Sequence, residues 1–407
     1  MKSLSVLLDL SVLATSTTSR GIGRYASELA VALHRQTRGN AELRILGLVS
    51  LPLWGQPRVS EDIPAVLEEL RTRQSRQGKS SWASRVRLSL ARAAVSTQAD
   101  VVHSLDPAAT PLVALGCPRV VTCHHVDSRL STEAWHGAGA QHSRTERRRF
   151  ARADRVVAIS RATAQELIAR LDVPREKISV VHNGADLERW SSAPRSDDGA
   201  RLSALGLVGT RFLLCVGAAD ARKNVAGVLQ GLARARKLSG QNNLMLVWAG
   251  RLEKGAHTEL DEQAKKSGIP GSVVKLGYVP DGDLAALYRS AVALVFTSRR
   301  EGFGYPVVEA MACGCPVITS NRSSMIEIAA EAALTVDPDD AEAIADAIVL
   351  LADDNAERRR LAKSGPERAT AFSAPKMAHE TLAVYQQTVV EQPAPASAPA
   401  SAKRAPE

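Results

Sequence analysis

The sequence predicts an α/β fold made of two Rossmann-like domains, each built on a parallel sheet. Short runs rich in Val, Ile and Leu alternate with helix-length segments through nearly the whole chain. This alternation is typical of βαβ units, whose parallel sheets are covered on both faces. The 407 residues suffice for two or three domains of roughly 100–200 residues each. A polar stretch near the middle divides the apolar runs into two sets.

The predicted strands form two sets of six. Those of the first half are Ser5–Leu10, Leu43–Val49, Val101–His103, Arg119–Cys123, Arg155–Ile159 and Ser179–Val181. Those of the second half are Phe212–Val216, Met245–Ala249, Val273–Leu276, Ala293–Phe296, Pro316–Thr319 and Ala333–Val336. Their shortness and the helix-length segments between them predict one parallel sheet in each half.

The domain boundaries follow from composition. The polar stretch Ser191–Arg201 predicts an interdomain linker. We therefore expect an N-terminal domain over 1–190 and a C-terminal domain over 202–375. A helix over 376–391 is expected to return to the N-terminal domain. The Pro/Ala/Ser-rich tail over 392–407 is expected to be disordered.

Composition and cysteine spacing favour a cytosolic protein. Cys313 and Cys315 do not form a Cys-x-x-Cys motif, and the five cysteines are interpreted as reduced thiols rather than metal ligands. The N-terminal run Leu4–Ala14 faintly resembles a signal peptide, but Asp9 interrupts it, so a buried strand explains it better. The chain lacks an apolar run of about 18 residues, so we predict no transmembrane helix.

The net charge of +9 lies entirely in the first half of the chain. Residues 1–190 contain 27 Lys and Arg against 18 Asp and Glu, whereas residues 191–407 contain 25 of each. The segment Arg71–Arg92 holds seven basic and no acidic residues, and more arginines gather in Arg144–Arg152. Such segments are either solvated faces or surfaces for an anionic partner, and we expect peripheral docking on the inner face of the cytoplasmic membrane. The aromatic content of 4% and the lack of a recognition motif argue against a nucleic-acid-binding protein.

The segment Glu301–Ala310 carries the densest functional signal. It follows a predicted strand and opens a helix expected to run from Pro306 to Cys313. Gly302 and Gly304 allow close approach of a ligand to the backbone, and the start of the helix directs free N–H groups at phosphate. In the same segment, Glu309 lies within the first helical turns, where its carboxylate can accept hydrogen bonds from ribose hydroxyls. An ordinary strand-to-helix turn is the alternative interpretation.

Two cations follow the strand Phe212–Val216. Arg222 and Lys223 lie at the carboxyl end of that strand, where parallel sheets bind ligands. Guanidinium and ammonium groups at this place suit a diphosphate, whose negative charge grows as it leaves. The alternative is a solvated pair of charges.

Together these motifs resemble glycosyltransferase family 4, the retaining family with the GT-B architecture of two domains facing a central cleft. The resemblance covers nearly the whole chain. The matching pieces are Arg222-Lys223-Asn224, the Gly250 loop, Leu276-Gly277-Tyr278-Val279, Glu301 through Glu309, Ala312 through Ile318, and Ser320-Asn321. Two positions depart from the family pattern: Met325-Ile326-Glu327 replaces Leu-Pro-Glu, and Phe372-Ser373-Ala374 replaces Phe-Ser-Trp.

The resemblance implies roles for the matching residues. Arg222 and Lys223 would hold the diphosphate of a nucleotide-sugar donor, and Glu309 would bind its ribose. The segment around Val279 would flank the base. The donor sugar would be held by Glu301, a catalytic residue in this scheme, with the loop Gly302, Phe303 and Gly304.

A second glycine motif, Gly21-Ile22-Gly23-Arg24-Tyr25, follows the first strand and predicts a tight turn before a helix beginning near Ala26. It lacks the third glycine of a dinucleotide fingerprint, which argues against NAD binding. The resemblance places Gly21, Gly23, Arg24 and Tyr25 across the cleft from the donor phosphates, as an acceptor or phosphate loop. This motif resembles mannosyltransferases of surface-polysaccharide assembly, including lipopolysaccharide, and makes GDP-mannose the leading donor.

Histidines end two of the predicted strands. Thr122-Cys123-His124 matches the Thr-x-His-Asp of the family with His125 in place of Asp, so His124 is predicted to lie near the reacting centre. A capping hydrogen bond is the alternative. Weaker candidates are His103, Ser160 and Asn183; for Asn183, turn chemistry is an equal alternative.

The mechanism implied by the resemblance is front-face substitution. No second carboxylate is placed opposite Glu301 for the double displacement of a retaining glycosidase. The chain has no Asp-x-Asp motif, so we expect no metal and no cofactor beyond the nucleotide-sugar co-substrate. The expected acceptor is a hydroxyl of a glycan or lipid-linked glycan. Alternatives are a UDP-sugar donor and a GT-B nucleotide-sugar 2-epimerase.

Overall fold

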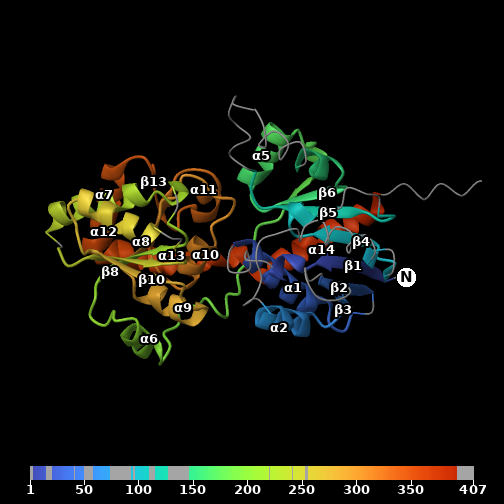
Figure 1. Ribbon diagram of the computed structural model, residues 1–407, viewed down its shortest axis with the longest axis horizontal. Helices are drawn as coiled ribbons and strands as arrows, with labels where there is room; N and C mark the ends of the chain where they lie inside the picture. The colour runs from blue at the N-terminus through green and yellow to red at the C-terminus, as the bar shows by residue number, and fades with distance from the viewer. Residues whose placement is uncertain are drawn as a thin grey trace, which may run out of the picture.

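The computed structural model describes residues 3–14, 21–40, 42–49, 58–73, 93–94, 97–109, 115–126, 146–219, 221–240, 242–252 and 255–391 (Figure 1). Two separate sheets organise these residues, one in each half of the chain. The two-domain α/β prediction is confirmed.

The N-terminal sheet has seven strands in the order β3-β2-β1-β4-β5-β6-β7. All neighbouring strands are parallel except β2 and β3. The strands are β1 (Leu4–Asp9), β2 (Leu43–Val49), β3 (Arg58–Ser60), β4 (Val101–Ser104), β5 (Arg119–Cys123), β6 (Arg155–Ala158) and β7 (Ile178–Val180). The antiparallel edge strand β3 was not predicted, because a run of three residues is too short for an alternation of apolar and polar side chains to be recognised.

The C-terminal sheet has six parallel strands in the order β10-β9-β8-β11-β12-β13. They are β8 (Phe212–Val216), β9 (Met245–Ala249), β10 (Val273–Gly277), β11 (Ala293–Phe296), β12 (Val317–Ser320) and β13 (Leu334–Val336). Each of the predicted strands is present within one residue at either end. Both sheets reverse their strand order beside the first strand of the domain, and such switch points bind ligands in α/β proteins.

Helices cover both sheets. The α-helices are α1 (Gly21–Thr37), α2 (Ile63–Arg73), α5 (Arg161–Leu171), α6 (Asp198–Ala204), α7 (Val225–Ser239), α8 (Ala256–Lys266), α9 (Asp281–Ser290), α10 (Tyr305–Ala312), α11 (Ser324–Ala329), α12 (Ala341–Asp353), α13 (Asn355–Ala369) and α14 (Ala374–Val390). Short 3-10 helices are η1 (Ser11–Ala14), η3 (Pro107–Ala109), η5 (Arg175–Lys177), η6 (Ala221–Lys223) and η7 (Thr370–Phe372). None of these described helices has the length and apolarity needed to cross a membrane.

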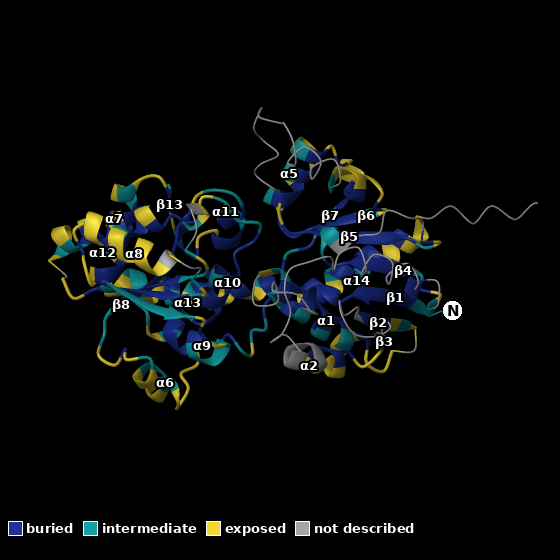
Figure 2. Cartoon of the chain, viewed as in Figure 1, coloured by how far each residue is buried: buried dark blue, intermediate teal, exposed yellow. Residues whose placement is uncertain are grey.

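Alternate residues of the strands enter different cores. In β1, Leu8 packs in one buried cluster and Leu7 in another, because successive side chains of a strand point to opposite faces. The strand β1 is drawn in the dark blue of buried residues in Figure 2. Both side chains are fully buried, and each such burial stabilises the fold by about 1.5–3 kcal/mol. The strands are therefore apolar on both faces, as the continuous Val, Ile and Leu runs indicate.

The chain crosses between the domains twice. Ala185 and the segment around Ser373 pair side by side: Ala185 N–H donates to the Phe372 carbonyl at 2.8 Å, and Ala374 N–H donates to the Ala185 carbonyl at 3.0 Å. After the second crossing, α14 packs against α1 and β4 in the N-terminal half, where its red ribbon lies beside the blue elements (Figure 1). Helix α6 begins at Asp198, inside the stretch expected to be a linker.

Several sequence features lie outside the described residues. These are the tail 392–407 and the stretch 74–92, which contains most of the first basic segment. In the second basic segment, Arg147 pairs with Asp172 at 2.6 Å.

Candidate active site

The loop between β11 and α10 is held by hydroxyl groups of the neighbouring segment. Ser324 Oγ donates to the carbonyls of Glu301 and Phe303 at 2.9 and 2.8 Å, and the Glu301 N–H donates to Ser323 Oγ at 3.1 Å. Gly304 has a φ of 123°, which excludes other residue types. Helix α10 begins at Tyr305, one residue before the predicted start.

The same loop touches the N-terminal domain at Gly302. A Cβ on Gly302 would lie 3.1 Å from the carbonyl carbon of His124 and would overlap its oxygen. Thr163 Oγ1 donates to the Gly302 carbonyl at 3.4 Å. Only glycine therefore fits at this junction between the domains.

The two predicted cations meet the first glutamate of the loop. Lys223 Nζ lies 2.8 Å from Glu301 Oε1, and Arg222 Nη1 lies 3.9 Å from Glu301 Oε2. The Lys223 ammonium also lies 4.2 Å from the ring centroid of Phe296 at the end of β11. Residues from two motifs about 80 positions apart thus share one place beyond the carboxyl ends of β8 and β11.

The second glutamate is buried in α10, the helix that follows this loop. Glu309 is 2% exposed, and Tyr288 Oη donates to its Oε2 at 3.0 Å. Its Oε1 accepts a hydrogen bond from Arg24 Nη1 of the other domain. Burial raises the pKa of Glu309, and the charge of Arg24 opposes that rise.

Arg24 has a second partner in the C-terminal domain. Its Nη2 donates to Asp281 Oδ1 at 2.6 Å, and Arg189 Nη1 donates to the other oxygen of Asp281 at 2.8 Å. The Arg24 guanidinium also lies 5.1 Å from the Trp190 ring centroid. We call Arg24, Glu309, Asp281 and Tyr288 the Arg24 network. It joins the domains, and Asp281 and Tyr288 were not singled out from the sequence, since no motif marks them.

The glycine motif of the first half does not form the predicted turn. Helix α1 begins at Gly21 rather than near Ala26, so Gly21, Gly23 and Arg24 lie in its first turns. The two glycines suggested a turn, but Gly21 begins the helix, and a Cβ there would lie at an ordinary contact distance of 4.0 Å from the Tyr305 ring. That prediction was wrong in local structure.

Tyr25 is fully buried in the N-terminal domain. Its hydroxyl lies 2.9 Å from Thr122 Oγ1, and its ring packs edge-on against the His124 ring at 4.9 Å. The Tyr25 ring therefore packs against the His124 ring and helps to hold it in place.

His124 is 7% exposed and its Nε2 lies 2.7 Å from the Leu105 carbonyl. Because a carbonyl only accepts, Nε2 carries the proton, and Nδ1 of the neutral ring is an acceptor. Burial lowers the pKa of His124 to about 4, although the Leu105 bond opposes that change. The ring is therefore neutral at pH 7.

His103 belongs to a buried hydrogen-bonded chain. Its Nδ1 lies 2.6 Å from Tyr385 Oη in α14, and its Nε2 lies 2.8 Å from Thr122 Oγ1. Burial lowers the pKa of His103 to about 3. Both ring nitrogens of His103 are thus hydrogen-bonded, and through Thr122 this residue is linked to Tyr25 as part of the buried core.

The remaining candidates lie near the domain junction. Ser160 caps α5, since its Oγ accepts the Thr163 N–H at 3.0 Å. Asn183 is buried, and its Oδ1 has no partner among the described residues. Val279 is 7% exposed, whereas its neighbour Tyr278 is 60% exposed.

Glu327, in the segment that departs from the family pattern, bridges the domains. Its carboxylate accepts the N–H groups of Arg161 and Ala162 at 3.0 and 3.1 Å, and lies 3.0 Å from His182 Nε2. These contacts lower the pKa of Glu327 against the effect of its partial burial. Although Met325 and Ile326 depart from the family pattern, Glu327 keeps its hydrogen bonds to the N-terminal domain.

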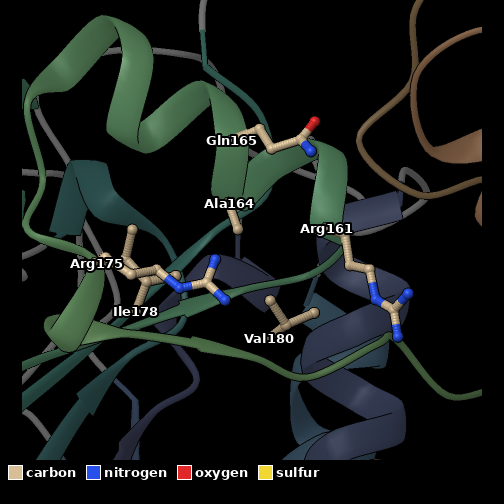
Figure 3. Close-up of a pocket in the computed structure, with 6 residues that line it drawn as sticks. All are labelled: Arg161, Ala164, Gln165, Arg175, Ile178 and Val180. Atoms are coloured by element: carbon tan, nitrogen blue, oxygen red, sulfur yellow. The ribbon is translucent and has the colours of Figure 1, made fainter.

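A hollow of about 440 Å³ lies between α5 and β7 (Figure 3). It is lined by Arg161, Ala164, Gln165, Arg175, Ile178 and Val180. The predicted site residues are not among these, although Arg161 follows Ser160. Within the described parts of the chain, no group of three or more His, Cys, Asp or Glu residues could hold a metal ion.

Comparison with protein families gives two matches that together span most of the chain. The model "Glycosyltransferase Family 4" matches residues 19–189, and "Glycosyl transferases group 1" matches residues 204–368. Similar proteins include an O-antigen chain mannosyltransferase B of Escherichia coli, 34% identical over 43% of this chain and 45% of that protein. An MMP alpha-(1->4)-mannosyltransferase of Mycolicibacterium hassiacum is 29% identical over 71% of each.

Solved structures share the fold. Anabaena Alr3699/HepE in complex with UDP-glucose superposes with a TM-score of 0.71 at 18% identity, covering 94% of this chain and 100% of that one. WaaG, a glycosyltransferase involved in lipopolysaccharide biosynthesis, superposes with a TM-score of 0.65 at 15% identity, covering 93% and 99%. At these identities the likeness establishes the architecture of two facing domains.

Proposed function

Because the chain belongs to glycosyltransferase family 4 and has the GT-B fold, we propose that it is a retaining hexosyltransferase of polysaccharide biosynthesis. The observation that carries this proposal is the meeting of Lys223 and Arg222 with Glu301 beyond the strand ends, in the loop that leads into the helix of buried Glu309. Cations, a helix start and a buried carboxylate are the groups that a nucleoside diphosphate sugar requires.

The donor would lie across the ends of β8 and β11. Lys223 and Arg222 would bind the diphosphate, Glu309 the ribose hydroxyls and Glu301 the sugar hydroxyls. The start of α10 would add its positive end to the phosphate site. Glu301 now neutralises Lys223, so diphosphate binding would free its carboxylate for the sugar.

The reaction would proceed on one face of the sugar. The bond between the anomeric carbon and the phosphate oxygen breaks, and the acceptor oxygen bonds to the same face. The acceptor proton passes to the departing phosphate oxygen, so the leaving group serves as base. Arg222 and Lys223 stabilise the charge that develops on it. His124, neutral with Nδ1 as acceptor, would orient a hydroxyl, since a pKa near 4 makes it a poor base at pH 7.

Mannose from GDP-mannose is the proposed donor group. The support is that the similar proteins include mannosyltransferases, among them the serotype-specific mannosyltransferase WbdA of Escherichia coli, 26% identical over 56% of this chain. A UDP-sugar donor is the second candidate, because the structural neighbour HepE binds UDP-glucose. A 2-epimerase would instead invert C2 of the donor sugar without any acceptor.

The proposed acceptor is a hydroxyl of a glycan or lipid-linked glycan, reached from the anionic inner face of the cytoplasmic membrane. The excess of nine positive charges in residues 1–190 supports this surface. Sedimentation with vesicles containing anionic lipid tests it: binding at low salt that weakens as salt rises is expected. No pelleting at low salt would refute membrane docking.

A donor screen tests the proposed activity. Thermal shift with GDP-, UDP-, ADP- and dTDP-sugars should identify one base, and GDP-mannose is expected to give the largest stabilisation. Nucleoside diphosphate release should then require an acceptor glycan, and NMR of the product should show the anomeric configuration of the donor retained. Release without acceptor, or an inverted product, would refute the proposal.

A further inference from the structure

The carboxylate proposed to bind ribose already has partners on both oxygens. Glu309 Oε1 accepts from Arg24 and Oε2 accepts from Tyr288 at 3.0 Å. The side chain of Glu309 is 3% exposed, and that of Arg24 is 24% exposed. A ribose hydroxyl can therefore reach Glu309 Oε1 only if the Arg24 guanidinium moves away.

Arg24 has a place to move to. Asp281 already accepts its Nη2 at 2.6 Å and is 31% exposed, so it lies nearer to solvent than Glu309. Asp281 and Glu309 both belong to the C-terminal domain, whereas Arg24 belongs to α1. A shift from one carboxylate to the other keeps the two domains joined.

We propose that Arg24 and the donor's ribose hydroxyls bind the same Glu309 carboxylate in turn, and that Arg24 moves onto Asp281 when the ribose arrives. This inference rests on the proposed function, since it takes Glu309 as the ribose ligand. It adds Arg24 as a positioning residue that competes with the donor, and Asp281 as the residue that receives it.

The physical reason for such an exchange is the cost of a buried charge. A carboxylate with 2% exposure requires a partner, and removing one member of a buried ion pair is strongly destabilising. Arg24 satisfies Glu309 until the two ribose hydroxyls can donate to it, so the carboxylate is never left alone. The cost of displacing Arg24 then weakens donor affinity and links it to the domain contact.

The test measures binding of GDP and of UDP by isothermal titration calorimetry. In Arg24→Ala the competitor is gone, so the Kd of the nucleotide that binds the wild type should fall. Coupling between sites typically amounts to about 5- to 150-fold, and we expect at least about fivefold tighter binding. Removing a cationic side chain near a phosphate site would ordinarily weaken binding, so the direction of the change is diagnostic.

Two further variants separate competition from other effects. Asp281→Asn should weaken binding by about fivefold, because a displaced Arg24 then loses the carboxylate to which it already donates. The matched control is Arg300→Gln, which removes another ion pair between the domains, Arg300 with Glu166 at 2.7 Å, in which neither Glu309 nor Asp281 takes part. It should leave the Kd within about twofold.

The outcomes distinguish this inference from the proposed function. Tighter binding in Arg24→Ala with an unchanged control supports the exchange. Equal or weaker binding in Arg24→Ala overturns it while the function stands. Tightening in Arg300→Gln as well would show that loosening the domains suffices, and also overturns it. If the wild type binds neither nucleotide, both proposals fail. If Arg24→Ala does not fold, Asp281→Asn decides, and unchanged or tighter binding there refutes the exchange.

Discussion

Replacing Gly302 with alanine places a methyl group against the backbone of the opposite domain. The new carbon would lie 3.1 Å from the His124 carbonyl carbon, overlap the carbonyl oxygen, and lie 3.4 Å from Ile159 Cδ1. Favourable carbon contacts lie at about 3.5–4.0 Å. The Ile159 side chain can rotate, whereas the His124 backbone directly follows β5 and is tied to that strand. The domains or the loop must therefore shift.

The size of the loss in stability or activity depends on whether the domain contact or the loop moves to make room for the methyl group. Overpacking of this kind costs about 1–3 kcal/mol, and 1 kcal/mol lowers the Tm of a domain of 150–250 residues by about 2–4 °C. If the loop moves instead, Glu301 and Gly304 move with it. A displacement of about 1 Å at a reacting centre can lower the rate 100-fold. We expect kcat/KM to fall by about 100-fold in Gly302→Ala, with a Tm loss of a few degrees.

Steady-state sugar transfer and thermal unfolding measure the two effects. The matched control is Gly199→Ala, because a Cβ on Gly199 meets no atom within 4 Å and its φ is not positive. The control should keep full activity and gain up to about 1 kcal/mol from its helical position in α6. If Gly302→Ala retains kcat/KM within about twofold of the wild type, the argument that the glycine sets the domain contact is wrong.

Three further changes test other parts of the site. Arg222→Ala should lower kcat/KM by about 100- to 1000-fold, as loss of one preorganised donor does, and leave Tm within about 2 °C, since the side chain is 57% exposed; near-normal turnover would refute its role. Tyr385→Phe leaves His103 Nδ1 without its 2.6 Å partner, so it should cost about 1–3 kcal/mol in urea unfolding while kcat/KM changes less than about threefold; a large activity loss would place His103 in the reaction. Burial raises the pKa of Glu28 from 4.5 to about 7 despite Arg189, so the folded protein binds the proton more tightly than the unfolded chain and stability falls as pH rises from 4.5 through 7. Glu28→Gln should remove up to about 3 kcal/mol of that fall. Urea unfolding at pH 5 and pH 8 measures the fall, and an equal loss of unfolding free energy in the variant and the wild type would contradict the prediction.

Much of the fold could be predicted from local pattern. The strand β8 and its parallel neighbours are buried on both faces, and their continuous apolar runs predict this burial. The edge strand β3 could not be recognised, since it has three residues and begins with an arginine. The start of α1 at Gly21 was missed because glycine indicates a turn by propensity, and propensity is a weak guide that tertiary context often overrides.

The site was predictable as a set of residues but not as a set of pairs. Strand ends marked Arg222, Lys223 and His124, because parallel strands bring their carboxyl ends to one edge. No motif indicated that Arg24 meets Asp281, a residue 257 positions away. A contact of that kind depends on how the two domains sit against each other, and no local pattern encodes it.

Both glutamates of the loop and helix are paired with cations, and this has a consequence for donor affinity. Glu301 neutralises Lys223, and Glu309 neutralises Arg24. A diphosphate sugar that binds here must break both pairs, yet it brings anionic oxygens for Lys223 and hydroxyls for both glutamates. Binding is therefore an exchange of partners, in which the gross attraction to phosphate is offset by the ion pairs it replaces. A ligand that supplies only the phosphates would free the glutamates without satisfying them, so inorganic pyrophosphate should bind far more weakly than the nucleotide sugar.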